Sequence, residues 1–243
     1  MNANSIRGWP APSCHRTKRA RAFTRLELAA VIAGSALLCL VALPLFGTTR
    51  NNSDRVACLN NLRLLARAVQ IWGADHQNEP SWTTFVSNGG TRPDAGAPFK
   101  PGFAWTEFTF LSNEVVTPRI LACPADAEAK IASDFIGYNA ASFRGLATSY
   151  FLNLHSTFEY PAGPLFGDRN VRFFVVGGCN LGVNNAVGAS STETNIVWTN
   201  ALHGLEGNIV RVDGAATTTT SEELRSAFGR TQATDGTHLL KAR

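Results

Sequence analysis

The chain of 243 residues carries 22 Lys and Arg against 18 Asp and Glu, a formal net charge of +4. With 44% hydrophobic and 16% charged residues, it has the composition of a globular protein and not of a disordered polyelectrolyte. Its 21 Gly and five Cys exclude a collagen and a disulfide-dense scaffold. The length suits one domain or two small ones. Whether the positive charge indicates nucleic-acid binding depends on where it lies.

The positive charge is concentrated at the N-terminus. The first 22 residues contain five basic residues and no acidic one: Arg7, Arg16, Lys18, Arg19 and Arg21. Without this segment, 17 basic residues remain against 18 acidic ones, and the net charge is −1. The basic segment therefore indicates an orientation signal and gives no support for nucleic-acid binding.

An apolar run follows the basic segment. Residues 28–46, LAAVIAGSALLCLVALPLF, contain no charged residue, and this is about the length of a membrane-spanning helix. The apolar region of a signal peptide is usually shorter, about 7 to 15 residues. Because basic residues resist translocation, the sequence predicts a retained single span with the N-terminus in the cytoplasm.

A further pattern surrounds this run. Ala22 is a small residue after the basic leader, Phe23 is aromatic, and the apolar helix carries Glu27 and Pro44. This segment resembles the N-terminus of type IV prepilins and type II secretion pseudopilins, although Ala22 replaces the usual Gly and Arg25 an apolar residue. The resemblance implies cleavage between Ala22 and Phe23, N-methylation of Phe23, and pairing of Glu27 with the α-ammonium of a neighbouring subunit. On the alternative interpretation, Glu27 and Arg25 lie among lipid headgroups and do little.

The residues after the run predict an α+β domain. Apolar residues recur at helical spacing over 55–77, and residues 78–102, rich in Gly and Pro, are expected to form a loop. Strand-like segments, separated by turn residues, indicate a small antiparallel sheet; they are 149–154, 171–176, 195–198 and 208–212. A T-x-x-E capping box predicts a short helix over 220–228. The last fifteen residues are polar and are expected to fray.

A second resemblance rests on the C-terminal part. The segments ACLNNLRLLARAVQIW, LACPAD, GDRN and WTNALHGLEGNIVRVDGA, with an H-x9-DG pattern from His203 to Asp213 and Gly214, resemble pilin-like proteins of planctomycetes and verrucomicrobia. This resemblance implies a pilin-like fold, with a long N-terminal helix, half transmembrane and half amphipathic, packed on the sheet. It also implies three parts: a leader, 1–22; a transmembrane and assembly helix, 23–47; and an extracytoplasmic domain, 48–243.

The polar residues of the globular part allow several interpretations. His203 with a carboxylate could act as a general base, but no Ser or Cys lies in a nucleophile-elbow context. Asp168 and Asp213 are weak calcium candidates whose spacing fits no known loop. The favoured interpretation is structural, because Asp213-Gly214 is a strong turn dipeptide. Four tryptophans could form glycan-binding platforms or lie in the core; they are Trp72, Trp82, Trp105 and Trp198.

The cysteines divide between compartments. If the run spans a membrane, only Cys58, Cys123 and Cys179 reach an oxidising space, so at most one disulfide forms. We favour Cys58 with Cys123, which would tie the helix to the following part. There is no CxxC, and none of these three cysteines has a His within ligand spacing, so their spacing does not suggest a metal site.

The leading functional hypothesis is a pseudopilin-like subunit of a type II secretion or type IV pilus-related filament. It is not expected to be an enzyme or to need a cofactor. Its expected partners are other pilin-like subunits, the prepilin peptidase and methylase, and the inner-membrane assembly platform. The expected location is the inner membrane, with the globular domain in the periplasm. The alternative is a membrane-anchored module that binds a glycan, a peptide or calcium; a tethered hydrolase is a weaker third hypothesis.

Overall fold

The computed structural model describes residues 24–172, 175–179, 181, 183–189, 196–229 and 237–242, with the backbone alone for 41–51, 101, 175–179, 183–189 and 237. The chain divides into two compact units, one ending at Gly47 and the other beginning at Thr48. The first helix, α1 (Arg25–Asp75), contributes to both units. The site described below lies wholly in the second unit.

A capping box starts α1. The Thr24 hydroxyl accepts a hydrogen bond from the Glu27 N–H at 3.2 Å, and the Glu27 carboxylate accepts one from the Thr24 N–H at 2.8 Å. This reciprocal pair satisfies two N–H groups that have no partner within the helix. Glu27 therefore has a local role in its own helix.

The transmembrane half of the predicted fold is wrong. Within the described part of the chain, no helix offers a stretch that is both long and apolar enough to cross a membrane. The structure keeps the α+β class with a mainly antiparallel sheet.

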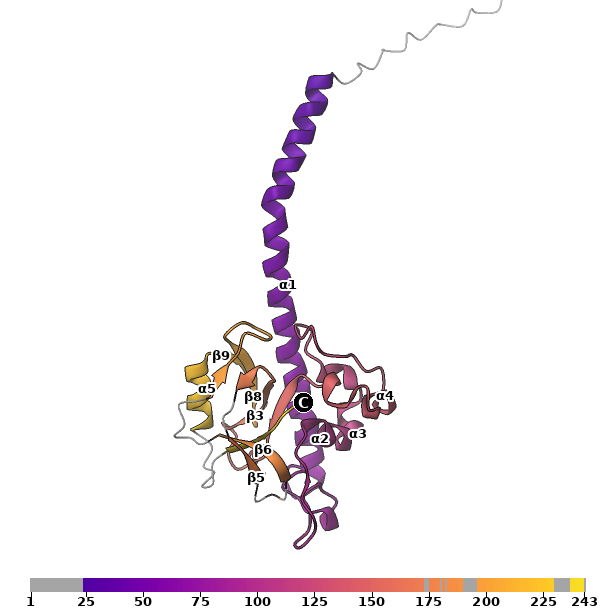
Figure 1. Ribbon diagram of the computed structural model, residues 1–243, viewed down its shortest axis with the longest axis vertical. Coiled ribbons are helices and arrows are strands. Elements are labelled where there is room, and N and C mark those ends of the chain that lie inside the picture. Colours follow the sequence, from indigo (N-terminus) through magenta and orange to yellow (C-terminus); the bar gives the residue numbers. More distant parts are fainter. Residues whose placement is uncertain are drawn as a thin grey trace, which may run out of the picture. The chain divides into compact units, whose positions relative to one another are not determined.

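The sheet of the second unit follows the order β1-β6-β10-β2-β3-β8-β9, with β5 also paired to β6 (Figure 1). All its neighbours are antiparallel except β1 and β6. Its strands are β1 (Lys100–Pro101), β2 (Tyr150–Asn153), β3 (Pro164–Asp168), β5 (Val175–Cys179), β6 (Val183–Ala189), β8 (Gly207–Arg211), β9 (Ala216–Thr219) and β10 (Thr237–Leu240). A separate pair is formed by β4 (Val171–Arg172) and β7 (Val197–Trp198).

Short helices complete the second unit. The α-helices are α2 (Ala104–Phe110), α3 (Ser112–Val115), α4 (Phe135–Asn139) and α5 (Ser221–Phe228). The 3-10 turns are η1 (Val86–Asn88), η2 (Pro118–Leu121) and η3 (Arg144–Ala147). The predicted cap of α5 is confirmed, because Thr220 and Glu223 form both hydrogen bonds of the capping box.

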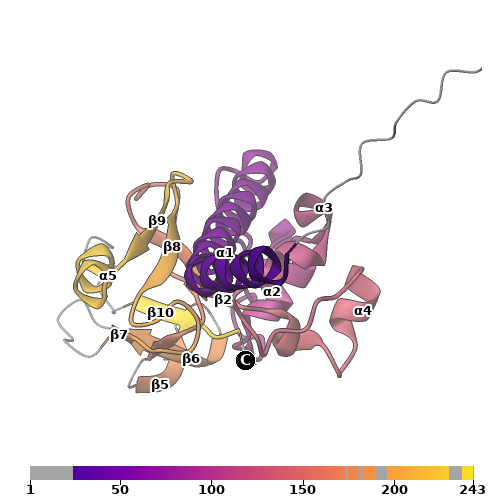
Figure 2. The same cartoon turned by 90° about the horizontal axis from the view of Figure 1, so that it is seen from above.

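Strands β2 and β3 are buried along their whole length. In β2, Leu152 packs in the cluster that contains the α1 side chains Leu62 and Val69, whereas Phe151 packs with Phe228 of α5. Successive strand residues point to opposite faces, so α1 and α5 cover opposite sides of this sheet (Figure 2). This arrangement explains the run of three apolar residues, Tyr150, Phe151 and Leu152, in β2.

The end of the chain also differs from the prediction. The expected frayed tail contains β10, which lies between β6 and β2, where Leu239 and Leu240 are fully buried. The short helix α5 is therefore not the last element. Tertiary contacts stabilise this strand, although its surroundings in the sequence are polar.

Candidate functional site

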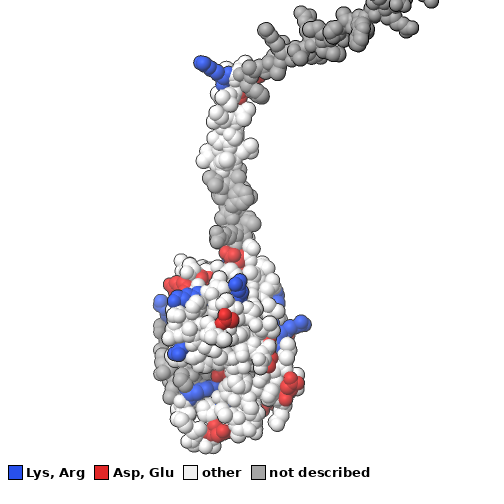
Figure 3. Space-filling model, turned by 90° about the vertical axis from the view of Figure 1, so that its right-hand side faces the viewer, with Lys and Arg blue, Asp and Glu red and all other residues white. Residues whose placement is uncertain are grey.

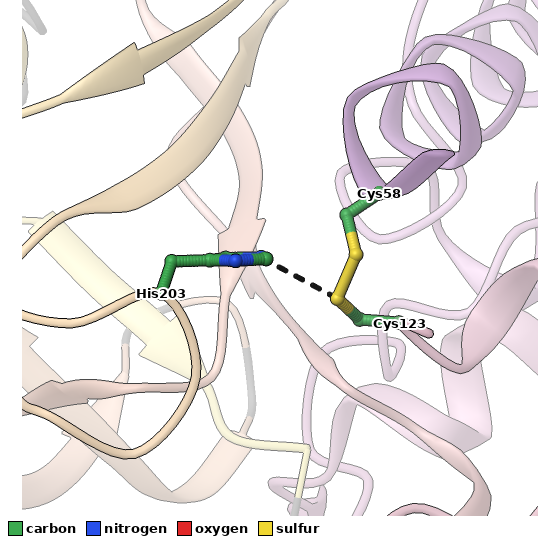
Figure 4. A group of neighbouring side chains, drawn as sticks. All are labelled: Cys58, Cys123 and His203. Carbon is green, nitrogen blue, oxygen red and sulfur yellow. Dashed lines mark hydrogen bonds between the residues drawn. A yellow bond between two sulfur atoms is a disulfide. The ribbon is translucent and has the colours of Figure 1, made fainter. Parts of the chain in front are cut away.

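The most distinctive group of side chains lies where α1, the segment around Cys123 and the loop before β8 meet. Cys58 of α1 and Cys123 form a disulfide, the pairing that we favoured from the sequence. His203 points its imidazole at this disulfide, with Nε2 3.5 Å from the Cys123 sulfur (Figure 4). Both cysteines and the His203 side chain are buried. Three segments far apart in sequence therefore converge on one small polar site.

Asp168 completes this site from the end of β3. Its Oδ2 lies 3.5 Å from His203 Nε2 and accepts a hydrogen bond of 2.7 Å from the Asn208 N–H. The carboxyl group is fully buried, and burial raises the pKa of Asp168 to about 7, against the lowering effects of the Asn208 N–H and the Arg55 charge. Its other oxygen, Oδ1, has no hydrogen-bond partner among the residues that the structure describes. An unpaired buried oxygen is costly, so this carboxyl group has capacity for a further ligand.

Arg55 holds the His203 loop against α1. Its guanidinium donates a 2.8 Å hydrogen bond to the His203 carbonyl oxygen and forms an ion pair with Glu206. Burial and the Arg55 charge lower the pKa of His203. The imidazole is therefore largely neutral at neutral pH. The sequence analysis did not identify Arg55 or Glu206, because nothing in the sequence links residues about 150 positions apart.

A second ion pair lies near the site. Arg169 donates two hydrogen bonds of 2.6 Å to the carboxylate of Asp126, and the Ser149 hydroxyl donates a third, of 2.7 Å. Burial opposes ionisation of Asp126, but these hydrogen bonds outweigh it and lower the pKa of Asp126. Arg169 is next to Asp168 in the sequence, but its bidentate partner is Asp126.

Asp213 and Gly214 lie away from His203 and form a turn. Asp213 is exposed between β8 and β9, where its carboxylate accepts a hydrogen bond from the Ala215 N–H at 2.9 Å, and Gly214 has φ of +85°. Asp168 contacts Asn208 near the start of β8, whereas Asp213 lies just beyond the end of this strand. A five-residue strand separates the two by roughly 16 Å, so the two calcium candidates cannot share an ion.

The remaining predicted site residues have no common location with His203. Ala22 and Phe23 fall outside the described residues, and Pro44 lies within α1, where only the backbone is described. The tryptophans are core residues: Trp72, Trp82 and Trp198 are at most 5% exposed, and Trp105 is partly buried. They do not form an exposed platform for a glycan.

A small cleft leads to the His203 loop. Its volume is about 240 Å³, and its lining residues are Asn52, Arg55, Ala125, Leu202, His203 and Gly204.

Over the described residues that Figure 3 shows, basic and acidic residues are interspersed. That face therefore has no continuous basic stripe of the kind that follows a phosphate backbone.

No model of a known protein family, no curated protein and no solved structure matches this chain.

Proposed function

We propose that this protein is a pilin-like structural subunit that assembles through the N-terminal part of α1 into a type II secretion or type IV pilus-related filament. The observation that carries the proposal is the exposed apolar surface of α1 before Gly47. Leu26, Leu38 and Leu40 are each at least 70% exposed. Soluble proteins rarely leave so many large apolar side chains on one helix without a partner surface.

The energy of covering this surface is large. Seven large apolar side chains of this segment are more than half exposed; they are Leu26, Leu28, Val31, Ile32, Leu37, Leu38 and Leu40. Full burial of one such side chain is worth roughly 1.5 to 3 kcal/mol. Packing of α1 against the same helix of other subunits would recover much of this energy. The proposal therefore gives the exposed residues a partner of their own chemistry.

The second unit supports the same proposal from another direction. A buried disulfide between Cys58 and Cys123 suits a protein of an oxidising compartment. We place this unit on the periplasmic side of the inner membrane, with other pilin-like subunits, the prepilin peptidase and methylase, and the assembly platform as partners. The alternative of a glycan-binding module lost its main support when the tryptophans proved to be buried.

Mass spectrometry of the N-terminus in the native host tests the proposed processing. We expect a mature chain that begins at an N-methylated Phe23. Ala22→Gly, which restores the residue usual in prepilins, should be cleaved at least as well as the wild type, whereas Ala22→Lys should accumulate uncleaved. A chain that keeps Met1, or one that begins after Gly47, contradicts the proposal. Equal processing of Ala22→Lys and the wild type contradicts it as well.

A further inference from the structure

We propose that the side chains at the Cys58–Cys123 disulfide form a zinc site when the disulfide is reduced. The ligands are the two cysteine sulfurs, His203 Nε2 and Asp168 Oδ2. The oxidised chain holds these sulfurs in a disulfide, and the reduced chain holds them on Zn²⁺. This inference does not depend on assembly of the protein into a filament.

The geometry of the oxidised chain already approaches that of a tetrahedral site. The sulfur and nitrogen ligand atoms of Cys58, Cys123 and His203 lie within 4.8 Å of one another. With usual Zn–S and Zn–N distances, tetrahedral S and N ligands are about 3.6 Å apart, and N and O ligands about 3.3 Å. His203 Nε2 is 3.5 Å from the Cys123 sulfur and 3.5 Å from Asp168 Oδ2. His203 Nε2 is therefore at ligand spacing from one sulfur and from the Asp168 oxygen, whereas Asp168 is not within 4.8 Å of every other ligand atom and must move toward the sulfurs.

The two sulfurs and the Asp168 carboxylate must therefore move when zinc binds. After reduction the two sulfurs must separate to about 3.8 Å, the distance between two thiolates on one zinc ion. A rotation of one cysteine side chain about its Cα–Cβ bond supplies a movement of this size. The backbone around the site is fixed by other contacts, because Arg55 ties the His203 loop to α1, and the Asn208 N–H orients Asp168.

Charge and hydrogen bonding also suit a dication. Two thiolates and the Asp168 carboxylate carry three negative charges, and Zn²⁺ reduces this to one, near the Arg55 guanidinium, which is itself paired with Glu206. The four ligand side chains are buried. The other oxygen of this carboxyl group, Oδ1, is buried and has no hydrogen-bond partner among the described residues. A cation on the carboxylate would offset part of the cost of burying it.

The exchange between the two forms balances. A partner disulfide oxidises the two zinc-bound thiolates, the Cys58–Cys123 bond forms, and the partner becomes two thiols after uptake of two protons. Zn²⁺ is released in this step. In the reverse direction, a dithiol gives two electrons and two protons to the disulfide and is itself oxidised to a disulfide. Zn²⁺ then displaces the two thiol protons. A reducing compartment therefore favours the zinc-bound chain, and an oxidising compartment favours the disulfide-bonded chain.

Cobalt substitution tests the site in the full-length chain. Cys14, Cys39 and Cys179 are first replaced by Ser, so that only Cys58 and Cys123 can supply sulfur. The chain is then reduced with a phosphine, which does not compete as a thiol, and titrated with Co²⁺ followed by Zn²⁺. We expect one equivalent of Co²⁺ with intense tetrahedral d–d bands and sulfur-to-cobalt charge transfer, lost on addition of Zn²⁺. The oxidised chain should show none of these bands.

Variants identify the ligands. His203→Ala and Asp168→Asn should each weaken Zn²⁺ binding by at least tenfold, and the Cys58→Ser, Cys123→Ser double variant should abolish it. Because a variant can fail to fold, the unfolding midpoint is measured as well: Zn²⁺ should raise it for the reduced chain and leave it unchanged for the oxidised chain. Absence of tetrahedral bands in the reduced chain overturns the proposal. Equal affinity in the wild type and His203→Ala also overturns it, because an unfolded chain or a thiolate-only site would behave in this way.

Discussion

Removal of the disulfide should cause a large loss of stability. The Cys58–Cys123 bond closes a loop with a sequence separation of 65 residues. In the chain-entropy account, a loop of this length restricts the unfolded chain by about 14 cal/mol/K, which is about 4 kcal/mol at 25 °C. Both cysteines are buried, so replacement by Ala adds no polar group to the core. We therefore expect Cys58→Ala with Cys123→Ala to lower the free energy of unfolding by about 4 kcal/mol.

Urea unfolding followed by tryptophan fluorescence measures this loss, because the buried Trp72, Trp82 and Trp198 become exposed on unfolding. Cys39→Ser is the matched control, since Cys39 is an exposed free cysteine, and its replacement should change stability by less than about 0.5 kcal/mol. A loss below about 1 kcal/mol in the double variant would refute the claim that this bond holds α1 to the rest of the domain.

Three further predictions concern packing, pH and assembly. Gly207→Ala should lower the free energy of unfolding by about 1 to 3 kcal/mol, because the new Cβ would lie about 2.5 Å from the indole ring of Trp198. Gly229→Ala is the control: there is space for its methyl group, so it should be close to neutral in the same urea assay. The pKa of Asp126 in the folded protein lies below its ordinary value, so the wild type should lose stability as the pH falls from about 5 downwards. Asp126→Asn should flatten this dependence of unfolding free energy on pH. Parallel pH dependences in the two proteins would contradict the prediction. Glu27→Gln should block filament assembly. Thr24→Ala removes the hydroxyl of the cap but keeps the charge of Glu27, so it should permit assembly. Equal defects in the two variants would show that Glu27 acts only as a helix cap.

Parts of the fold follow from local sequence signals. The capping box at Thr220 sets the start of α5, and the turn at Gly214 has the positive φ that the Asp-Gly dipeptide predicts. The helical spacing after residue 55 correctly identified the side chains, such as Leu62 and Val69, that pack on the sheet. These signals depend on residues within a few positions of one another.

Other parts depend on contacts that the sequence does not encode locally. The strand β10 lies in a polar surrounding and is stabilised by its place between β6 and β2. The pairing of Arg169 with Asp126, and that of Arg55 with Glu206, join residues 43 and 151 positions apart. The absence of a CxxC motif led us to predict no metal site, because the ligands of the proposed site come from four separate segments and converge only in the folded chain.

Imaging of filaments tests the central claim most directly. Filaments sheared from the native host should bind an antibody raised against residues 48–243. Leu38→Asp places a charge on the exposed apolar surface of α1, so it should abolish the filaments while the second unit stays folded. The account would be contradicted if the antibody bound only unassembled protein and the filaments were unchanged in the Leu38→Asp variant.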